Sequence, residues 1–344
     1  MINSIQYLRA LAAWMVVLHH FFQIAFKSGT SDGLAYFFYY GAYGVDLFFV
    51  ISGFVIYHSI SGKVITFKQF MLQRIARIIP AYWFFTLLVA VLVIHYQGLI
   101  PSTAFSPLFL LKSLFFLPEN NPSGIGFYPL LTVGWTLNYE MVFYFIVALT
   151  LILPTKFRLV ATTLGLCLLI FAGSKLNNFS FYSNKMMLEF LFGVIVNLLW
   201  KKGLIQKIPG SAAIAFVILA LLVIGFEKAG HHYLRTGIPC ALIFTAVISQ
   251  NHRLNHLWII HLGNWSYSTY LCHVLILAAL HSFATAFGFH SLFIACFGLP
   301  CIVIASYLSY TFIEKPAQLY FYSFANRKHI LTTARESRSL NTSI

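Results

Sequence analysis

Apolar runs recur along almost the whole of this chain, and they restrict its fold more than any other feature. A helix needs about 20 residues to cross a bilayer whose hydrocarbon core is about 30 Å thick. The runs that approach this length are 8–26, 41–59, 78–97, 134–153, 158–173, 186–200, 212–227, 234–249, 264–287 and 291–313. The pattern predicts an all-α, polytopic integral membrane protein with about ten transmembrane helices.

Composition indicates the same class. Only 9% of the 344 residues are charged and 60% are hydrophobic, whereas a soluble domain carries about 25% charged residues. A water-soluble fold of this composition could not cover its surface with polar groups, so lipid must surround most of the chain. We expect no metal site, because the cysteines lie in apolar runs without the spacing of metal ligands. They are Cys167, Cys240, Cys272, Cys296 and Cys301.

The distribution of Lys and Arg predicts the orientation. With the N-terminus in the cytoplasm, fifteen basic residues lie on the inner side and six on the outer side, while Arg9 lies in the first span. This bias favours a multi-pass protein with both termini inside. The net charge of +14 then follows from orientation and from attraction to membrane lipids, so we expect no nucleic-acid partner.

The chain is predicted to hold one membrane domain, residues 1–316, followed by a basic cytoplasmic tail, 317–344, that we expect to be disordered. The longest segment between spans, 98–133, is rich in proline and is predicted to form a lid or a wall facing an acceptor on the outer side. Within it, 105–117 is too short to span, so we interpret it as interfacial or re-entrant.

Ionisable side chains inside spans are costly and therefore point to function. Arg9 and His20 are 11 residues apart in the first run, which places them on one helix face, about 16 Å apart along the axis. His19 is rotated away, and we expect it to form a hydrogen bond between helices. His20, Asp46 and Glu140 come from three spans and are predicted to lie at similar depth.

This clustering has two interpretations. One is a catalytic histidine whose carboxylate partners orient it and set its basicity. The other is a buried ion-pair network that fixes helix packing. Glu189 lies at the edge of its span and is expected to be interfacial, whereas His273 fits either a site residue or a packed core histidine.

A second group of charges is predicted at the inner face. Arg74 and Arg77 are three residues apart on one helical face, near Lys68, and Arg9 joins them from the first span. Guanidinium groups gathered at one place suit a phosphorylated ligand. The alternative is that these charges only orient the protein and bind lipid headgroups.

Several motifs occur together in a characteristic order. They are Arg9 and His20 in an R-x10-H arrangement, GAYGVDLFFVISGFVI from Gly41, RIAR at 74–77, GWTLNYE at 134–140, WSYSTYLCH at 265–273 and IEKP at 313–316. Together they resemble the acyltransferase family 3 membrane proteins. The resemblance implies a membrane O-acyltransferase, most often an O-acetyltransferase, that moves an acyl group from cytoplasmic acyl-CoA to a hydroxyl of a cell-envelope polysaccharide or glycolipid.

The same resemblance implies roles for individual residues. His20 would be the catalytic base, with Asp46 and Glu140 as its polar partners. Arg9, Arg74 and Arg77 would bind the donor. Thr136 stands where the family more often has Ser, which keeps the hydroxyl. Further candidates in these motifs are His273, Trp135, Tyr139 and Ser268, with Glu314 as a structural acid at the inner face.

The resemblance also implies the surroundings of the protein. It places the chain in the bacterial cytoplasmic membrane. The donor substrate would be acyl-CoA, most often acetyl-CoA, and no cofactor would be bound. The acceptor sugar, a covalent intermediate and an oligomer are left open. The competing function is a proton-coupled transporter or flippase, in which His20 and the carboxylates would relay protons. The absence of an internal repeat and the presence of the arginine group favour the enzyme.

Overall fold

The computed structural model describes residues 2–25, 39–96, 100, 103–226, 231–289, 291–321 and 323, and within these ranges it contains helices and no strands. The long helices are α1 (Asn3–Ala25), α3 (Gly44–Ile60), α4 (Phe67–His95), α5 (Pro107–Leu114), α6 (Trp135–Thr150), α7 (Thr155–Lys175), α8 (Glu189–Lys201), α9 (Gly210–Phe226), α10 (Gly237–Ser249), α11 (Leu257–Phe287) and α12 (Ser291–Ser309). Short turns of 3₁₀-helix are η1 (Gly41–Tyr43), η2 (Thr132–Gly134), η3 (Asn177–Ser183), η4 (Lys185–Leu188), η5 (Ile205–Lys207) and η6 (Asn251–Arg253), and a π-helical turn, η7 (Tyr310–Glu314), follows α12.

The all-helical class predicted from the apolar runs is confirmed. Each predicted span coincides with a helix, and 7 helices among the described residues are long and apolar enough to cross a membrane. The helices α8, α9 and α10 have only 13, 17 and 13 residues. Several membrane-length helices are therefore established, whereas the number ten stays a prediction.

Helix α4 begins well before the apolar run that predicted it. Thr66 caps its first turn, accepting a bond from the Gln69 backbone N–H at 3.2 Å, while the Gln69 side chain accepts one from the Thr66 N–H at 3.1 Å. This capping box satisfies two backbone N–H groups at the start of the helix, so the helix begins before the apolar run that could span a membrane. As a result, Arg74 and Arg77 lie inside α4 and not in a loop before it.

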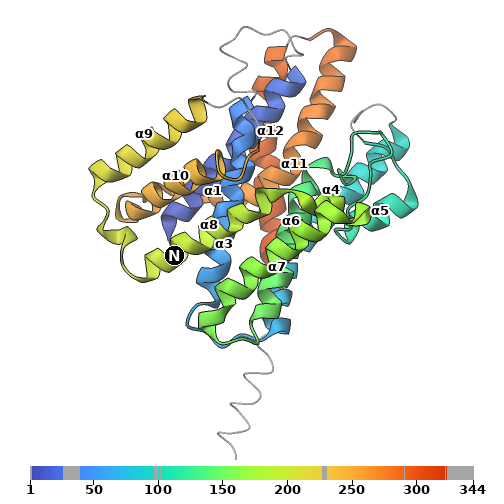
Figure 1. The fold of residues 1–344 in the computed structure, drawn as a ribbon. Helices are drawn as coiled ribbons and strands as arrows, with labels where there is room; N and C mark the ends of the chain where they lie inside the picture. The colour runs from blue at the N-terminus through green and yellow to red at the C-terminus, as the bar shows by residue number, and fades with distance from the viewer. Residues whose placement is uncertain are drawn as a thin grey trace, which may run out of the picture.

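Two pairs of helices organise the centre of the molecule. Helix α1 packs along α11, and α3 packs against α8, while α9 with α10 and α4 with α5 lie on opposite sides of this centre (Figure 1). At the α3–α8 crossing, a Cβ on Gly53 would lie 1.9 Å from the Phe190 carbonyl oxygen, and one on Gly193 would lie 1.9 Å from that of Val50. Only glycine permits so close an approach of two backbones, as is common between membrane helices.

The segment between α4 and α6 folds back against α4. Its short helix α5 begins with Pro107 after the capping residue Ser106, and the interfacial or re-entrant position of 105–117 stays a prediction. The Tyr82 hydroxyl donates to the Ser113 carbonyl at 2.9 Å and the Trp83 indole N–H to the Leu114 carbonyl at 2.9 Å. These bonds hold the segment close to the bundle.

The expected tail begins as helix. The last membrane-length segment runs from Phe293 to Phe321. It therefore extends past residue 317, where the tail was predicted to begin. Residues 324–344, for which we predicted disorder, lie outside the described residues.

Candidate active site

The first turns of α1, most of α3 and parts of α4, α6 and α11 enclose a cavity of about 450 Å³. We call it the arginine cavity, because Arg9 from α1 and Arg74 and Arg77 from α4 line it. The structure therefore brings together the three cations that the sequence predicted at one place. Its other polar lining comes from Gln6, Ser52, His58, Thr136, Glu140, Tyr144, Tyr267 and Tyr270.

The protein satisfies these guanidinium groups only in part. The Arg74 group lies 5.5 Å from the ring centre of Phe70 and 6.0 Å from that of Tyr144. Its Nε atom is buried and has no hydrogen-bond partner among the described residues. Arg9 donates to the Gln6 side chain at a long 3.4 Å. Guanidinium N–H groups whose hydrogen bonds within the protein are incomplete are suited to an anionic ligand.

Glu140 belongs to the arginine cavity. Its Oε1 atom accepts a hydrogen bond from the Ser52 hydroxyl at 2.7 Å and another from the Tyr144 hydroxyl. The expectation that Glu140 is a partner of His20 is therefore wrong. The depth estimate placed these residues at a common level, but depth alone does not determine which side of a helix faces which cavity.

A second cavity, of about 650 Å³, lies beyond the first. We call it the histidine cavity, because His19, His20, His231 and His281 line it. Residues 125–135 supply one wall, through Ile125, Tyr128, Thr132, Val133 and Trp135. Four of these residues belong to the segment 98–133, whose role as a wall facing an acceptor stays a prediction. His19 lines this cavity too, and its ring centre lies 4.8 Å from that of His20. The two histidines therefore border one cavity, although the Cβ of His19 lies next to Gly41 and His20 meets His273.

The neighbours of His20 determine which of its nitrogens carries the proton. The Nδ1 atom of the fully buried His273 lies 3.1 Å from the Thr269 carbonyl, so it donates there and leaves its Nε2 as an acceptor. His20 Nδ1 lies 3.0 Å from that Nε2 and 3.1 Å from the Val16 carbonyl, both of which are acceptors. His20 Nδ1 is therefore protonated, and the lone pair belongs to Nε2.

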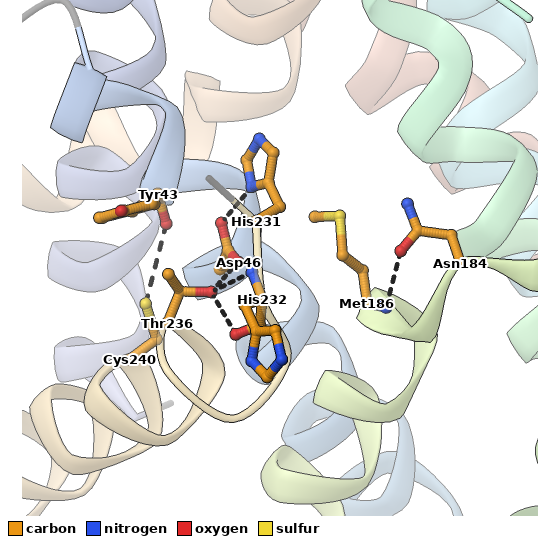
Figure 2. Close-up of polar contacts among 8 residues, drawn as sticks. All are labelled: Tyr43, Asp46, Asn184, Met186, His231, His232, Thr236 and Cys240. Carbon is orange, nitrogen blue, oxygen red and sulfur yellow. Dashed lines mark hydrogen bonds and ion pairs between the residues drawn. The ribbon is translucent and has the colours of Figure 1, made fainter. Parts of the chain in front are cut away.

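Asp46 is not a partner of His20 either. It is fully buried, and its two oxygens accept bonds from the Thr236 hydroxyl at 2.6 Å and from His231 Nδ1 at 2.7 Å (Figure 2). Burial lowers the pKa of His231, but the hydrogen bond and charge of Asp46 outweigh burial and raise this pKa above its ordinary value. The predicted pairing of histidine with carboxylate thus exists, but on a different histidine.

The two cavities share a wall. Val45 and Tyr270 line both of them. The Tyr270 hydroxyl lies 2.9 Å from the Thr136 hydroxyl and donates to the Val133 carbonyl at 2.9 Å, so its ring is held in place. We call these two residues the septum. The septum separates a cationic compartment from a histidine-rich one inside a single helix bundle.

The remaining candidates differ in position. Trp135 lines the histidine cavity. Tyr139 is buried and donates to the Phe181 carbonyl at 2.9 Å. The Ser268 hydroxyl donates to Glu314 and lies 2.7 Å from the Ser309 hydroxyl. Tyr139, Ser268 and Glu314 are absent from both cavity linings, which indicates a packing role and agrees with the structural role expected for Glu314.

His231 was missed because it lies in a short connection before α10, where no helical periodicity marks it. The available signal was Asp46, an acid in an apolar span that needs a partner. Glu189 was misplaced for a similar reason. It is fully buried beside Asp46 and Gly237, whereas its position at the edge of a span suggested an interfacial residue.

Relatives of known name share most of this chain. An exopolysaccharide production protein, ExoZ, of Rhizobium meliloti (strain 1021) is 33% identical over 282 residues, which cover 79% of this chain and 86% of the relative. A protein of Staphylococcus aureus (strain COL), provisionally named an O-acetyltransferase, is 24% identical over 352 residues, covering 90% of this chain. The chain spans 56% of the length of that second relative. No solved structure matches.

The family comparison covers nearly the whole bundle. A family model described as an acyltransferase domain matches residues 2–311, a range that contains both cavities and the septum. The chain therefore belongs to the acyltransferase 3 family, and it is a multi-pass membrane acyltransferase that transfers groups other than aminoacyl groups.

Proposed function

We propose that this protein is an O-acetyltransferase that moves an acetyl group from cytoplasmic acetyl-CoA to a hydroxyl of a cell-envelope polysaccharide. The observation that carries the proposal is the pair of cavities on either side of the septum. A cationic cavity suits a phosphorylated donor, and a histidine cavity suits a neutral hydroxyl acceptor.

On the donor side, Arg9, Arg74 and Arg77 hold the phosphates of CoA. Three guanidinium groups around one cavity match several phosphate oxygens, and the buried Nε of Arg74 supplies a donor without a partner among the described residues. The arginine end then faces the cytoplasm, where acyl-CoA is found, in agreement with the excess of basic residues predicted there. The pantetheine arm passes the septum and presents the thioester to the histidine cavity.

On the acceptor side, His20 is the general base. Its Nε2 lone pair takes the proton of the acceptor hydroxyl while the hydroxyl oxygen forms a bond to the thioester carbon. The carbon–sulfur bond then breaks, and the leaving thiolate of CoA takes the proton from His20. His273 positions the imidazole by accepting the Nδ1–H bond. The name of the Rhizobium meliloti relative, an exopolysaccharide production protein, supports a polysaccharide acceptor.

Mass spectrometry of envelope polysaccharide tests this proposal. Cells that produce the protein should gain alkali-labile acetyl groups on the polysaccharide, whereas cells that produce His20→Ala at equal protein level should not. If export of the polysaccharide depends on the protein while its acetyl content does not change, the chain acts as a transporter or flippase and the proposal is wrong.

A further inference from the structure

We propose that His231, held by Asp46, is a second catalytic group, which donates a hydrogen bond from Nε2 to the carbonyl oxygen of the acyl donor as charge develops there. This inference rests on the proposed function, because it assumes a thioester in the histidine cavity. It assigns to His231 a task different from that of His20, which accepts a proton.

The geometry of the pair is that of an oriented imidazole. Asp46 is buried completely, and its Oδ2 atom lies 2.7 Å from His231 Nδ1, while Thr236 holds the other oxygen at 2.6 Å. The His231 side chain remains 29% exposed and lines the histidine cavity. With Nδ1 directed at the carboxylate (Figure 2), Nε2 is the nitrogen left for a ligand.

His231 borders the cavity into which the donor is proposed to pass, and Asp46 holds it there from the start of α3. A Cβ on Gly44 would lie 2.3 Å from the Ala12 carbonyl oxygen and 2.8 Å from the Val16 side chain, so the start of α3 is level with that part of α1. Asp46 therefore lies about two helical turns from His20, toward the arginine cavity. It follows Val45 of the septum in the chain. His231 and His20 both line the histidine cavity, so a thioester that crosses the septum enters a space that both imidazoles border.

The charges around the two histidines favour this division of tasks. Among the described residues, His20 has a neutral imidazole and a carbonyl as its hydrogen-bond partners, which suits a neutral base. His231 faces a buried carboxylate, which favours the protonated imidazole that can donate from both nitrogens. The other groups packed around the pair are Tyr43 from η1, Trp135 from α6, Glu189 from α8 and Cys240 from α10.

A preorganised donor at a developing oxyanion contributes about 10² to 10³-fold in rate. The step remains balanced, because the proton that leaves the acceptor hydroxyl travels through His20 to the CoA thiolate, while His231 keeps its own proton throughout. His231 must be protonated to act, so its contribution is complete at low pH and is lost as pH rises through its raised pKa.

The experiment uses membrane vesicles containing the full chain, radiolabelled acetyl-CoA and polysaccharide of the same strain from which alkali has removed the ester groups. The pH dependence of label transfer is measured for the wild type, His231→Ala, His231→Gln and Asp46→Asn. We expect His231→Ala to lower the rate by about 10² to 10³-fold. His231→Gln should retain part of the rate through its amide N–H and lose the decline at high pH. Asp46→Asn should move that decline to lower pH.

His232→Gln is the matched control. His232 is the adjacent imidazole, and its Nδ1 accepts bonds from the backbone of Leu234 and Arg235 inside the same connection. Its substitution tests whether damage to this connection alone lowers the rate, and we expect the pH profile to keep its shape. An unchanged rate and profile in both His231 variants would overturn the inference. Absence of transfer by the wild type would instead overturn the proposed function.

Discussion

At the scale of single residues, the two histidines on α1 carry the most informative contrast. Both line the histidine cavity, but α1 rotates by about 100° from one residue to the next. His20 is directed at His273 on α11, whereas the Cβ of His19 lies next to Gly41 at the start of the α3 region. The contact with His273 orients the His20 ring with Nε2 as its basic nitrogen.

We expect His20→Ala to lower acetyl transfer by about 10² to 10⁴-fold, because the general base is lost. His19→Ala should lower it much less. Both variants should insert normally, since removal of an imidazole makes the helix more apolar. Label transfer from acetyl-CoA, measured at matched protein levels, provides the comparison. Equal losses in the two variants would contradict the assignment of the base to His20.

At the scale of elements, α4 determines how the three arginines of the arginine cavity meet. Its capping box lets the helix start before the apolar run, so Arg74 and Arg77 occur one turn apart on a rigid element. Arg9 reaches the same cavity from α1. Helical spacing predicted the first pair, whereas the approach of α1 to α4 depends on how both pack around α11.

We expect Arg74→Ala and Arg77→Ala to raise the KM for acetyl-CoA, because each removes charge-assisted bonds to phosphate. Lys at either position should restore this KM only in part, since an ammonium group cannot form the paired bonds of a guanidinium. Initial rates over a range of acetyl-CoA concentrations measure the effect. A double Ala variant with an unchanged KM would mean that these charges serve orientation alone.

At the scale of the whole molecule, the septum makes two compartments of one bundle. Val45 and Tyr270 separate the arginine cavity from the histidine cavity, and they come from helices far apart in the sequence. The arrangement suits a reaction whose acyl donor and acceptor arrive from opposite sides of a membrane. The proposal therefore requires a particular orientation of the chain in the membrane, which can be tested.

We predict that reporter fusions after Lys63, Lys156 and Lys201 face the cytoplasm, and that fusions near Asn120 and Ser180 face the opposite side. The reason is the excess of Lys and Arg on the first side, fifteen against six. Activity of paired cytoplasmic and extracytoplasmic reporters gives the measurement. A fusion after Lys63 that reproducibly reports the opposite side would contradict the proposed route of the donor.

Much of this protein could be predicted from local features of the sequence. Apolar length and sparse charge identify membrane helices, because each helix satisfies its own backbone and needs only an apolar exterior. Helical periodicity predicted that Arg9 and His20 face the interior together and that Arg74 and Arg77 share a face. These properties depend on residues within one element, so a single segment contains the necessary information.

The partners inside the bundle were decided by the tertiary structure alone. His20 meets His273 across 253 positions of sequence, and Asp46 meets His231 across 185. These contacts depend on close crossings such as that of Gly44 with Ala12, which set how far each helix slides along its neighbour. Depth in the membrane could be estimated from the sequence. The neighbouring helix that a side chain meets could not be predicted from the sequence, because packing between distant segments determines that contact.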